Sequence, residues 1–251
     1  MLHIGIISIF PEMFRAIINY GVTKKAITQG IIKLNILNPR DYTNDKHRNI
    51  DDRLYGGGPG MLMMAEPLKL AIEHAKSIIH CNSKVFYLSP KGQKINQEKI
   101  KKLSKMPNMI LLCGRYQGID ERLINSEIID EEISIGDYVL SGGELPAMIL
   151  IDMLSRFIPG TLGKDQSKKN NSFYNGLLDC PHYTKPRIFN NIKVPHVLLS
   201  GNHKKIKQWR LKQSLGQTWM KRPDLFKNIK LSQEELKLLK NFKIEMLKKN
   251  K

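Results

Sequence analysis

The chain has 251 residues, 41% of them hydrophobic, and its 41 basic and 23 acidic side chains give a net charge of +18, so it can form a hydrophobic core and is neither collagen-like, low-complexity nor coiled-coil. The N-terminus lacks the pattern of a signal peptide, and the longest apolar stretch, residues 145–158, is too short to span a bilayer, so we expect a cytoplasmic protein without membrane association. The three cysteines are far apart and form no CxxC pair, which argues against a disulfide framework and against a zinc site.

The first 37 residues predict an α/β opening. Residues 4–10 form an apolar run of strand length, and Pro11 suits the first turn of a helix that buries an apolar face. Gly21 is expected to end that helix, and a second short helix runs to about Gln29. Residues 31–37 then read as a second strand.

A glycine-rich segment follows at residues 51–61, where four glycines and a proline occupy positions 56–60. This composition cannot hold a helix or a central strand, so we expect a shaped loop that cradles a phosphate or a substrate. A flexible linker is the alternative. The segment is not a P-loop, because no Gly-Lys-Ser/Thr follows it.

Helices and strands alternate from there to residue 158. Helical spacing occurs at 66–79, 96–106 and 119–126, and strands are predicted at 84–88, 109–112 and 133–135. The alternation is typical of a mainly parallel sheet covered on both faces. Residues 145–158 are apolar nearly all round and predict a buried helix, near whose end Arg156 is either paired with a buried anion or lies at the surface.

Three of the predicted strands end in loops rich in small or special residues. These loops are Ser89-Pro90, residues 114–118 and residues 136–143. Because ligands bind beyond the carboxyl ends of parallel strands, we expect the loops to share one rim, where glycines let a ligand approach the backbone. For any one loop, a strand-to-helix turn without a ligand is the competing interpretation.

The last third of the chain differs in charge. Residues 161–251 hold 21 basic and 6 acidic side chains, whereas residues 1–160 hold 20 and 17. Residues 161–175 lack periodicity and read as a flexible linker, and residues 176–251 as a basic helical domain after a first domain at 1–160. Asn202 is expected to cap one helix, and residues 232–235 match a capping box. Clustered positive charge favours a nucleic acid as partner, with compositional drift as the alternative.

Several motifs together resemble one known family. They are the glycine loop 56–61, Gly114-Arg115-Tyr116, residues 134–146, residues 178–184 and Leu199-Ser200-Gly201-Asn202-His203. They closely resemble the bacterial tRNA (guanine-N1)-methyltransferase family, TrmD, from residue 4 to about residue 242. The resemblance implies an α/β fold of the SPOUT type with a trefoil knot, a small helical C-terminal domain and a homodimer. It also implies methyl transfer from S-adenosylmethionine, with magnesium as a further candidate cofactor, to N1 of guanosine 37 in tRNA.

The resemblance also assigns residues to the site. The positions that it implies for binding the methyl donor are Tyr87, Leu88, Ser89, Gly114, Tyr116, Gly118, Ile135, Gly136, Asp137, Tyr138, Val139, Leu140, Gly142, Gly143 and Pro146. The positions expected to bind tRNA, the first three by the resemblance and the last three as basic residues of the helical domain, are Asp51, Gly60, Ser167, Lys204, Lys205 and Arg210. No cluster of metal ligands is apparent.

The catalytic assignment departs from the family at one position. Guanine N1 carries a proton, so its methylation requires a base, and the charge that shifts to O6 requires a cation or donor, a role that matches Arg156. The family's general base is an aspartate immediately before the Ser-Phe pair that is Ser172-Phe173 here, and this chain has Asn171 at that position. Asp165 and Asp179 are the candidate substitutes. Gln117 and Leu54 also replace the family's usual glutamate and proline.

Two other functions remain open on the sequence. One is a catalytically impaired tRNA-binding protein of the same fold, favoured by Asn171. The other is a SPOUT methyltransferase that acts on ribosomal RNA, which the fit of the motifs to the tRNA enzyme disfavours.

Overall fold

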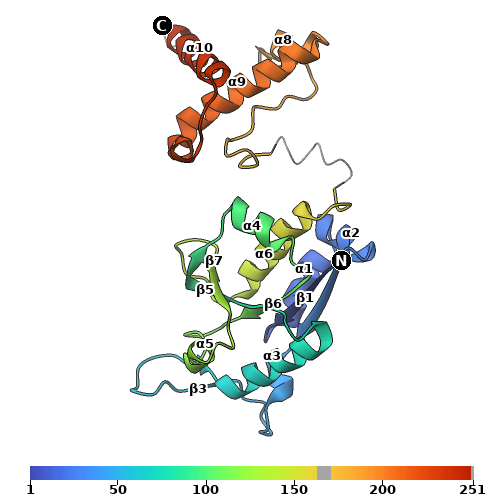
Figure 1. The fold of residues 1–251 in the computed structure, drawn as a ribbon, viewed down its shortest axis with the longest axis vertical. Coiled ribbons are helices and arrows are strands. Elements are labelled where there is room, and N and C mark those ends of the chain that lie inside the picture. The colour runs from blue at the N-terminus through green and yellow to red at the C-terminus, as the bar shows by residue number, and fades with distance from the viewer. Residues whose placement is uncertain (163–170, 250–251) are drawn as a thin grey trace. The chain divides into compact units, whose positions relative to one another are not determined.

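The computed structural model describes residues 1–162 and 171–249 (Figure 1). The chain divides into two compact units, Met1–Gly163 and Lys164–Lys251. In the described part of the chain, no helix combines the length and apolar character needed to cross a membrane. The predicted linker at 161–175 lies in large part outside the described residues.

The first unit is built on a five-stranded sheet in the order β2-β1-β6-β5-β7, and every pair of neighbouring strands is parallel. This confirms the predicted parallel α/β sheet. Its strands are β1 (Leu2–Ile7), β2 (Ile32–Leu37), β5 (Val85–Lys94), β6 (Asn108–Cys113) and β7 (Glu131–Ser134). Its helices are α1 (Arg15–Ile18), α2 (Gly21–Thr28), α3 (Ala65–Ile79), α4 (Gln97–Leu103), α5 (Arg122–Asn125) and α6 (Glu144–Phe157), with short 3₁₀ turns η1 (Pro11–Phe14) and η2 (Pro39–Tyr42).

Helices cover both faces of the sheet, and the alternation within β6 shows how (Figure 1). Met109, Leu111 and Cys113 pack in the core beside α6, whereas Ile110 and Leu112 pack in the core beside α3. Because successive side chains of a strand point to opposite faces, a strand buried on both sides is apolar throughout. That is why the strand at 109–112 could be read directly from an uninterrupted apolar run.

Two details differ from the sequence prediction. Strand β5 does not stop at Ser89-Pro90; it continues to Lys94, and its pairing with β7 shifts register between Leu88 and Gln93. Pro90 is tolerated because it lies at this irregularity, where no ladder hydrogen bond is required of it. Gly21 begins α2 rather than ending the preceding helix, which stops at Ile18.

The glycine-rich segment forms the tip of a small hairpin. Strands β3 (Asp51–Asp52) and β4 (Leu62–Met63) pair in antiparallel fashion on either side of it. The glycines at 56, 57, 58 and 60 all have positive φ, a conformation that side chains disfavour. The segment is therefore a shaped loop, as predicted.

The second unit is mainly helical, as predicted. It contains the short hairpin β8 (Ile188–Phe189) and β9 (Ile192–Lys193), followed by α8 (His196–Leu199), α9 (His203–Lys221), η3 (Pro223–Asn228) and α10 (Gln233–Lys249). The Asn202 side chain caps α9 by accepting the N–H of Lys205, and Ser232 and Glu235 form the expected capping box before α10. Leu215, Leu238 and Leu239 form its small core.

Candidate functional site

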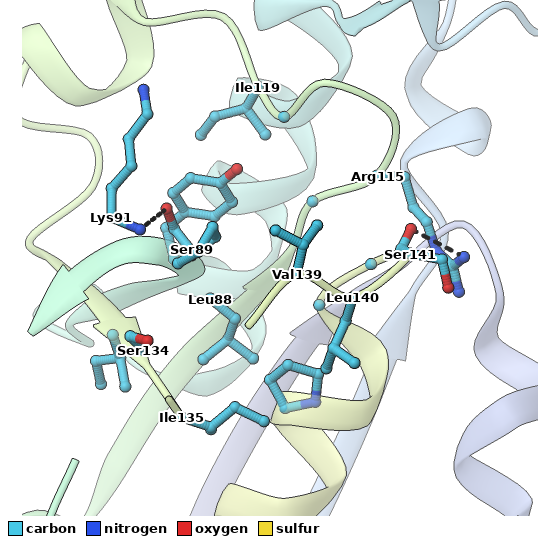
Figure 2. Close-up of a pocket in the computed structure, with 18 of the residues that line it drawn as sticks. Leu88, Ser89, Lys91, Arg115, Ile119, Ser134, Ile135, Val139, Leu140 and Ser141 are labelled. Carbon is cyan, nitrogen blue, oxygen red and sulfur yellow. Dashed lines mark hydrogen bonds between the residues drawn. The ribbon is translucent and has the colours of Figure 1, made fainter. Parts of the chain in front are cut away.

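A pocket lies at the irregular middle of β5 and at the carboxyl ends of β6 and β7, where the three segments predicted to form the rim meet (Figure 2). Its cavity volume is about 230 Å³, somewhat below the usual range for small-molecule sites. Strand β5 contributes Tyr87 to Lys91, and the loop after β6 contributes Gly114 to Ile119. The end of β7 and the loop that leads to α6 contribute Ile133 to Gly136 and Tyr138 to Gly143. Glu121, Ile124 and Pro146 complete the lining. The convergence of the loops is therefore confirmed.

The walls of the pocket are mixed, with slightly more apolar than polar surface. Figure 2 shows Leu88, Ile135 and Leu140 gathered at one end of the pocket, and Ile119 and Val139 extend its apolar lining. Polar and charged residues, among them Ser89, Lys91 and Glu121, line it together with the glycine-bearing turns. A combination of apolar walls and convergent polar groups is the usual chemistry of a cofactor site.

The Tyr87 side chain packs against the loop after β6. Its side chain is buried, and a Cβ added to Gly114 would lie 2.8 Å from the Tyr87 hydroxyl. A Cβ on Gly118 would lie 3.1 Å from the same oxygen. Burial, helped by the charge of Glu132, raises the pKa of Tyr87 to about 12, so the phenol stays neutral at physiological pH. Two glycines are thus required here because the tyrosine ring occupies the space of their side chains.

The loop after β7 is shaped by Ser134 and Gly136. The Gly136 N–H donates to the Ser134 Oγ at 3.1 Å, and that hydroxyl donates to the Gly136 carbonyl at 3.0 Å. The Tyr138 ring lies against Gly136, which leaves no room for a Cβ there. Asp137 points elsewhere: it pairs with Lys94 and does not line the pocket.

The loops after β6 and β7 are joined in the wall of the pocket through Arg115. Its Nε donates to Glu144 Oε2 at 2.8 Å, and its Nη1 donates to the Ser141 carbonyl at 3.2 Å, as drawn in Figure 2 for Ser141. The guanidinium lies over the Phe10 ring, 4.6 Å from the centroid.

Burial, and then the charge of Glu144, raises the pKa of the Cys113 thiol well above its ordinary value, so Cys113 is no nucleophile at neutral pH.

The glycine hairpin lies beside this pocket. The Gln117 N–H donates to the Met61 carbonyl at 2.9 Å, and a Cβ on Gly60 would lie 2.8 Å from the Gln117 side chain. Partial burial and a side-chain hydrogen bond with Asp51 raise the pKa of Tyr116, a pocket residue. Asp51 and Gly60, both expected to bind tRNA, therefore touch residues of the pocket loop.

Helix α6, which carries Arg156, is less buried than its sequence predicted. The prediction that α6 is buried all round is wrong, because one stripe of the helix is exposed. Along it lie Leu145 (46% exposed), Ile149 (44% exposed), Asp152 and Arg156. The surface alternative for Arg156 is thus the one that the chain adopts. These positions recur at helical spacing and form one continuous strip.

The remaining catalytic candidates belong to the second unit. Asn171 is exposed, and Ser172, the next residue, donates to Asp179 Oδ1 at 2.6 Å. The Asp179 N–H donates back to Ser172 Oγ at 3.0 Å, and His182 Nε2 lies 3.4 Å from Asp179 Oδ2. A closed turn therefore holds a carboxylate next to Asn171. Asp165 and Ser167 lie outside the described residues.

The three basic residues predicted to bind tRNA lie on α9. Lys204, Lys205 and Arg210 are all exposed, so their charge is available to a polyanion. No group of three or more His, Cys, Asp or Glu side chains that could hold a metal occurs among residues 1–162 and 171–249.

Every residue that was predicted to bind the methyl donor lines the pocket, except Asp137. The prediction did not include the pocket residues Lys91, Arg115, Gln117 and Glu121. Arg115 nevertheless belongs to the Gly114-Arg115-Tyr116 motif, and Gln117 stands where the family usually has glutamate. Loop membership was the signal that could have identified them. It also missed Ser8 and Glu144, whose link to Arg115 no local pattern indicates.

Comparison with known proteins agrees with the resemblance. The family model described as tRNA (Guanine-1)-methyltransferase TrmD matches residues 2–228. A tRNA (guanine-N(1)-)-methyltransferase of Buchnera aphidicola subsp. Baizongia pistaciae is 61% identical over 236 residues, which cover 94% of each chain. Proteins with the same name from Klebsiella pneumoniae and Edwardsiella ictaluri are 59% and 58% identical over 242 residues, covering 96% of this chain and 94% and 95% of theirs.

Proposed function

The chain belongs to the tRNA (guanine-1)-methyltransferase family of enzymes, and we propose that it transfers a methyl group from S-adenosylmethionine to N1 of guanosine 37 in tRNA. The observation that carries this proposal is the single pocket formed by the three rim loops, which contains all but one of the predicted donor-binding residues. The family membership supplies the class of reaction, and the pocket supplies a place for the donor.

The residues of the pocket fit this donor. S-adenosylmethionine presents a flat, largely apolar adenine, which suits walls such as Leu88, Ile135 and Leu140, and its polar edge can bond to backbone groups of the glycine-bearing turns. Gly114, Gly136 and Gly142 leave space where a Cβ would collide with neighbouring side chains. When bound, the donor supplies a methyl group on a positively charged sulfur, which an attacking nitrogen accepts directly.

The chemistry demanded of the protein is proton removal from N1 and stabilisation of charge on O6. We assign the second task to Arg156, whose guanidinium is always charged and exposed at the end of α6. Asn171 cannot perform the first, because a carboxamide does not accept a proton at neutral pH. Asp179 is our candidate base, because Ser172 holds its carboxylate one residue from the family's base position.

The second unit supplies affinity for the tRNA backbone. The exposed Lys204, Lys205 and Arg210 on α9, together with the strongly basic composition of residues 161–251, favour contacts with phosphates. Asp51 and Gly60, which touch the pocket loop, are our candidates for contacts near the reacting guanosine, and Ser167 completes the set by resemblance. We propose three segments: a catalytic domain at 1–160, a flexible linker at 161–175 and a tRNA-binding domain at 176–251.

Fold and assembly complete the proposal. We infer a SPOUT arrangement with a trefoil knot, supported by the parallel sheet and by the two loops that interlock through Gly114, Arg115 and Gly143 at the carboxyl ends of β6 and β7. We also infer a cytoplasmic homodimer. The exposed Leu145 and Ile149 of α6 support it, because two copies can bury these apolar side chains against each other.

Methyl transfer tests the function. The purified chain is incubated with radiolabelled S-adenosylmethionine and unmodified tRNA that has guanosines at positions 36 and 37, and the digested RNA is analysed for 1-methylguanosine. Label at position 37, and its loss when guanosine 37 is replaced, is the expected result. Ribosomal RNA serves as the competing substrate. Donor and tRNA binding without transfer would instead favour a catalytically impaired tRNA-binding protein, an alternative that the comparisons do not support.

A further inference from the structure

Glu144, the first residue of α6, is a completely buried acidic side chain with a partner on each carboxylate oxygen. Ser8 Oγ, just beyond β1, donates to Oε1 at 2.8 Å. Arg115 Nε, just beyond β6, donates to Oε2 at 2.8 Å. A carboxylate removed from water is unfavourable unless its partners are well placed, so these contacts constrain all three residues tightly.

Arg115 passes this constraint to the pocket. Its Nη1 donates to the Ser141 carbonyl at 3.2 Å, and its backbone pairs with Gly142 as an isolated bridge. A Cβ on Gly142 would meet the Arg115 side chain and would lie 2.6 Å from Glu144 Oε2. Ser141, Gly142 and Arg115 all line the pocket, whereas Glu144 and Ser8 do not.

We propose that Glu144, with Ser8, is a positioning residue for the methyl-donor pocket. Through Arg115 it holds the 141–143 turn against the end of β6, so that the backbone groups of both loops are already arranged before the donor arrives. This inference rests on the proposed function, because it concerns the same pocket. Preorganisation of this kind improves affinity by reducing the ordering that binding otherwise requires.

The arrangement predicts separable effects on two ligands. Breaking the Glu144 contacts loosens the 114–118 and 141–143 turns and lowers affinity for the donor. It leaves Lys204, Lys205 and Arg210 of the second unit unchanged, so affinity for tRNA in the absence of donor is preserved. A merely structural role would lower both affinities together, or neither, in proportion to stability.

The first test measures binding of S-adenosylhomocysteine by calorimetry. Glu144→Gln keeps the shape of the side chain but removes its negative charge and leaves one acceptor oxygen for the two donors Arg115 and Ser8. We expect its dissociation constant to rise at least about tenfold, with tRNA affinity within twofold of wild type. Arg115→Lys should act in the same direction, because a single ammonium cannot reach both Glu144 and Ser141. Ser8→Ala should have a smaller effect in that direction, since it removes one hydrogen bond.

Two controls separate positioning from stability. Glu73→Gln removes an exposed carboxylate from α3 and should bind S-adenosylhomocysteine as wild type does. Leu103→Ala removes a buried core side chain at the end of α4 and should lower the midpoint of urea unfolding without changing donor affinity. The proposal is overturned if Glu144→Gln, Arg115→Lys and Ser8→Ala all bind like wild type, or if Leu103→Ala at equal loss of stability weakens donor binding as much.

A second measurement does not depend on any ligand. Amide hydrogen exchange is followed in the free protein at residues 114–118 and 141–143, with α3 as internal reference. Faster exchange confined to the two turns in Ser8→Ala and Glu144→Gln supports the proposal, and unchanged exchange in both contradicts it. If the wild-type chain does not bind S-adenosylhomocysteine, the proposed function fails, while this exchange measurement still decides whether Glu144 positions the turns.

Discussion

Gly143 approaches β6 so closely that a Cβ added to it would lie 2.7 Å from the Cα of Cys113. Its N–H also donates to the Gly114 carbonyl at 2.9 Å. The turn before α6 is therefore seated on the end of β6, and this contact closes one side of the pocket.

Gly143→Ala should separate the two loops. A methyl group has no space against backbone atoms, so we expect a loss of about 1–3 kcal/mol in the free energy of unfolding and roughly tenfold weaker binding of S-adenosylhomocysteine. Urea denaturation and calorimetry measure the two effects. Ser77→Ala on α3 is the control, and wild-type values for Gly143→Ala would show that the close approach is not needed.

Tyr87 predicts a specific pH dependence of stability. Its folded-state pKa is raised from 10 to about 12, so both states are neutral below pH 10, and the unfolded state releases the proton first as the pH rises. The free energy of unfolding of the wild type should therefore fall by about 2 kcal/mol more than that of Tyr87→Phe between pH 10 and pH 12. Parallel curves for the two proteins would contradict the burial of this phenol.

Some of this site could be predicted from the sequence, and the reasons differ between its parts. Apolar runs such as 109–112 identify strands buried on both faces. Loops rich in small or special residues, predicted to follow three strands, identify the rim. The Glu144–Ser8 contact joins residues 136 positions apart, and no local periodicity encodes it. The family motifs then identified particular residues of the rim as donor-binding. Of these predicted residues, only Asp137 does not line the pocket.

Helix α6 shows why burial was predicted incorrectly. An apolar side chain facing the core and one facing outward look the same in a linear pattern, so Leu145 and Ile149 read as core positions. Similarly, Pro90 suggested a strand end, whereas β5 resumes beyond an irregularity that only its pairing with β7 reveals.

The exposed strip of α6 predicts the assembly state. Ile149→Glu places a charge in the middle of the strip and should convert the proposed homodimer into monomers, as measured by analytical ultracentrifugation. Ile78→Glu, at a comparably exposed apolar position of α3, is the matched control and should stay dimeric. A wild-type chain that sediments as a monomer would contradict the dimer itself.

The basic residues of α9 predict a salt-dependent affinity. Replacing Lys204, Lys205 and Arg210 by glutamine should weaken tRNA binding and reduce the slope of log affinity against log salt by up to about 2–3, with donor affinity unchanged. Filter binding at several salt concentrations provides the slope. Lys24, Lys25 and Lys33 are exposed in the first unit, and their replacement removes the same charge without the same loss. Equal losses in both triple variants would mean that only net charge matters.

The turn that contains Asn171 predicts a kinetic coupling. Asn171→Asp restores the family's carboxylate and should raise the single-turnover rate of methyl transfer by about 10²-fold or more. Asp179→Asn should lower the rate in the wild-type background but much less in Asn171→Asp, where the other carboxylate accepts the proton. Asn175→Asp in the same segment is the control. A rate that Asn171→Asp leaves unchanged would show that proton removal is already efficient.

We propose that residues 87–91 of β5 and the turns after β6 and β7 hold the methyl donor, and a crystal structure of the wild-type chain with S-adenosylhomocysteine tests this most directly. The account predicts the adenine between Leu88, Ile135 and Leu140, with its polar edge bonded to backbone atoms of the glycine-bearing turns. A ligand seated elsewhere, or a pocket that stays empty at saturating concentration while the ligand is bound in solution, would contradict it.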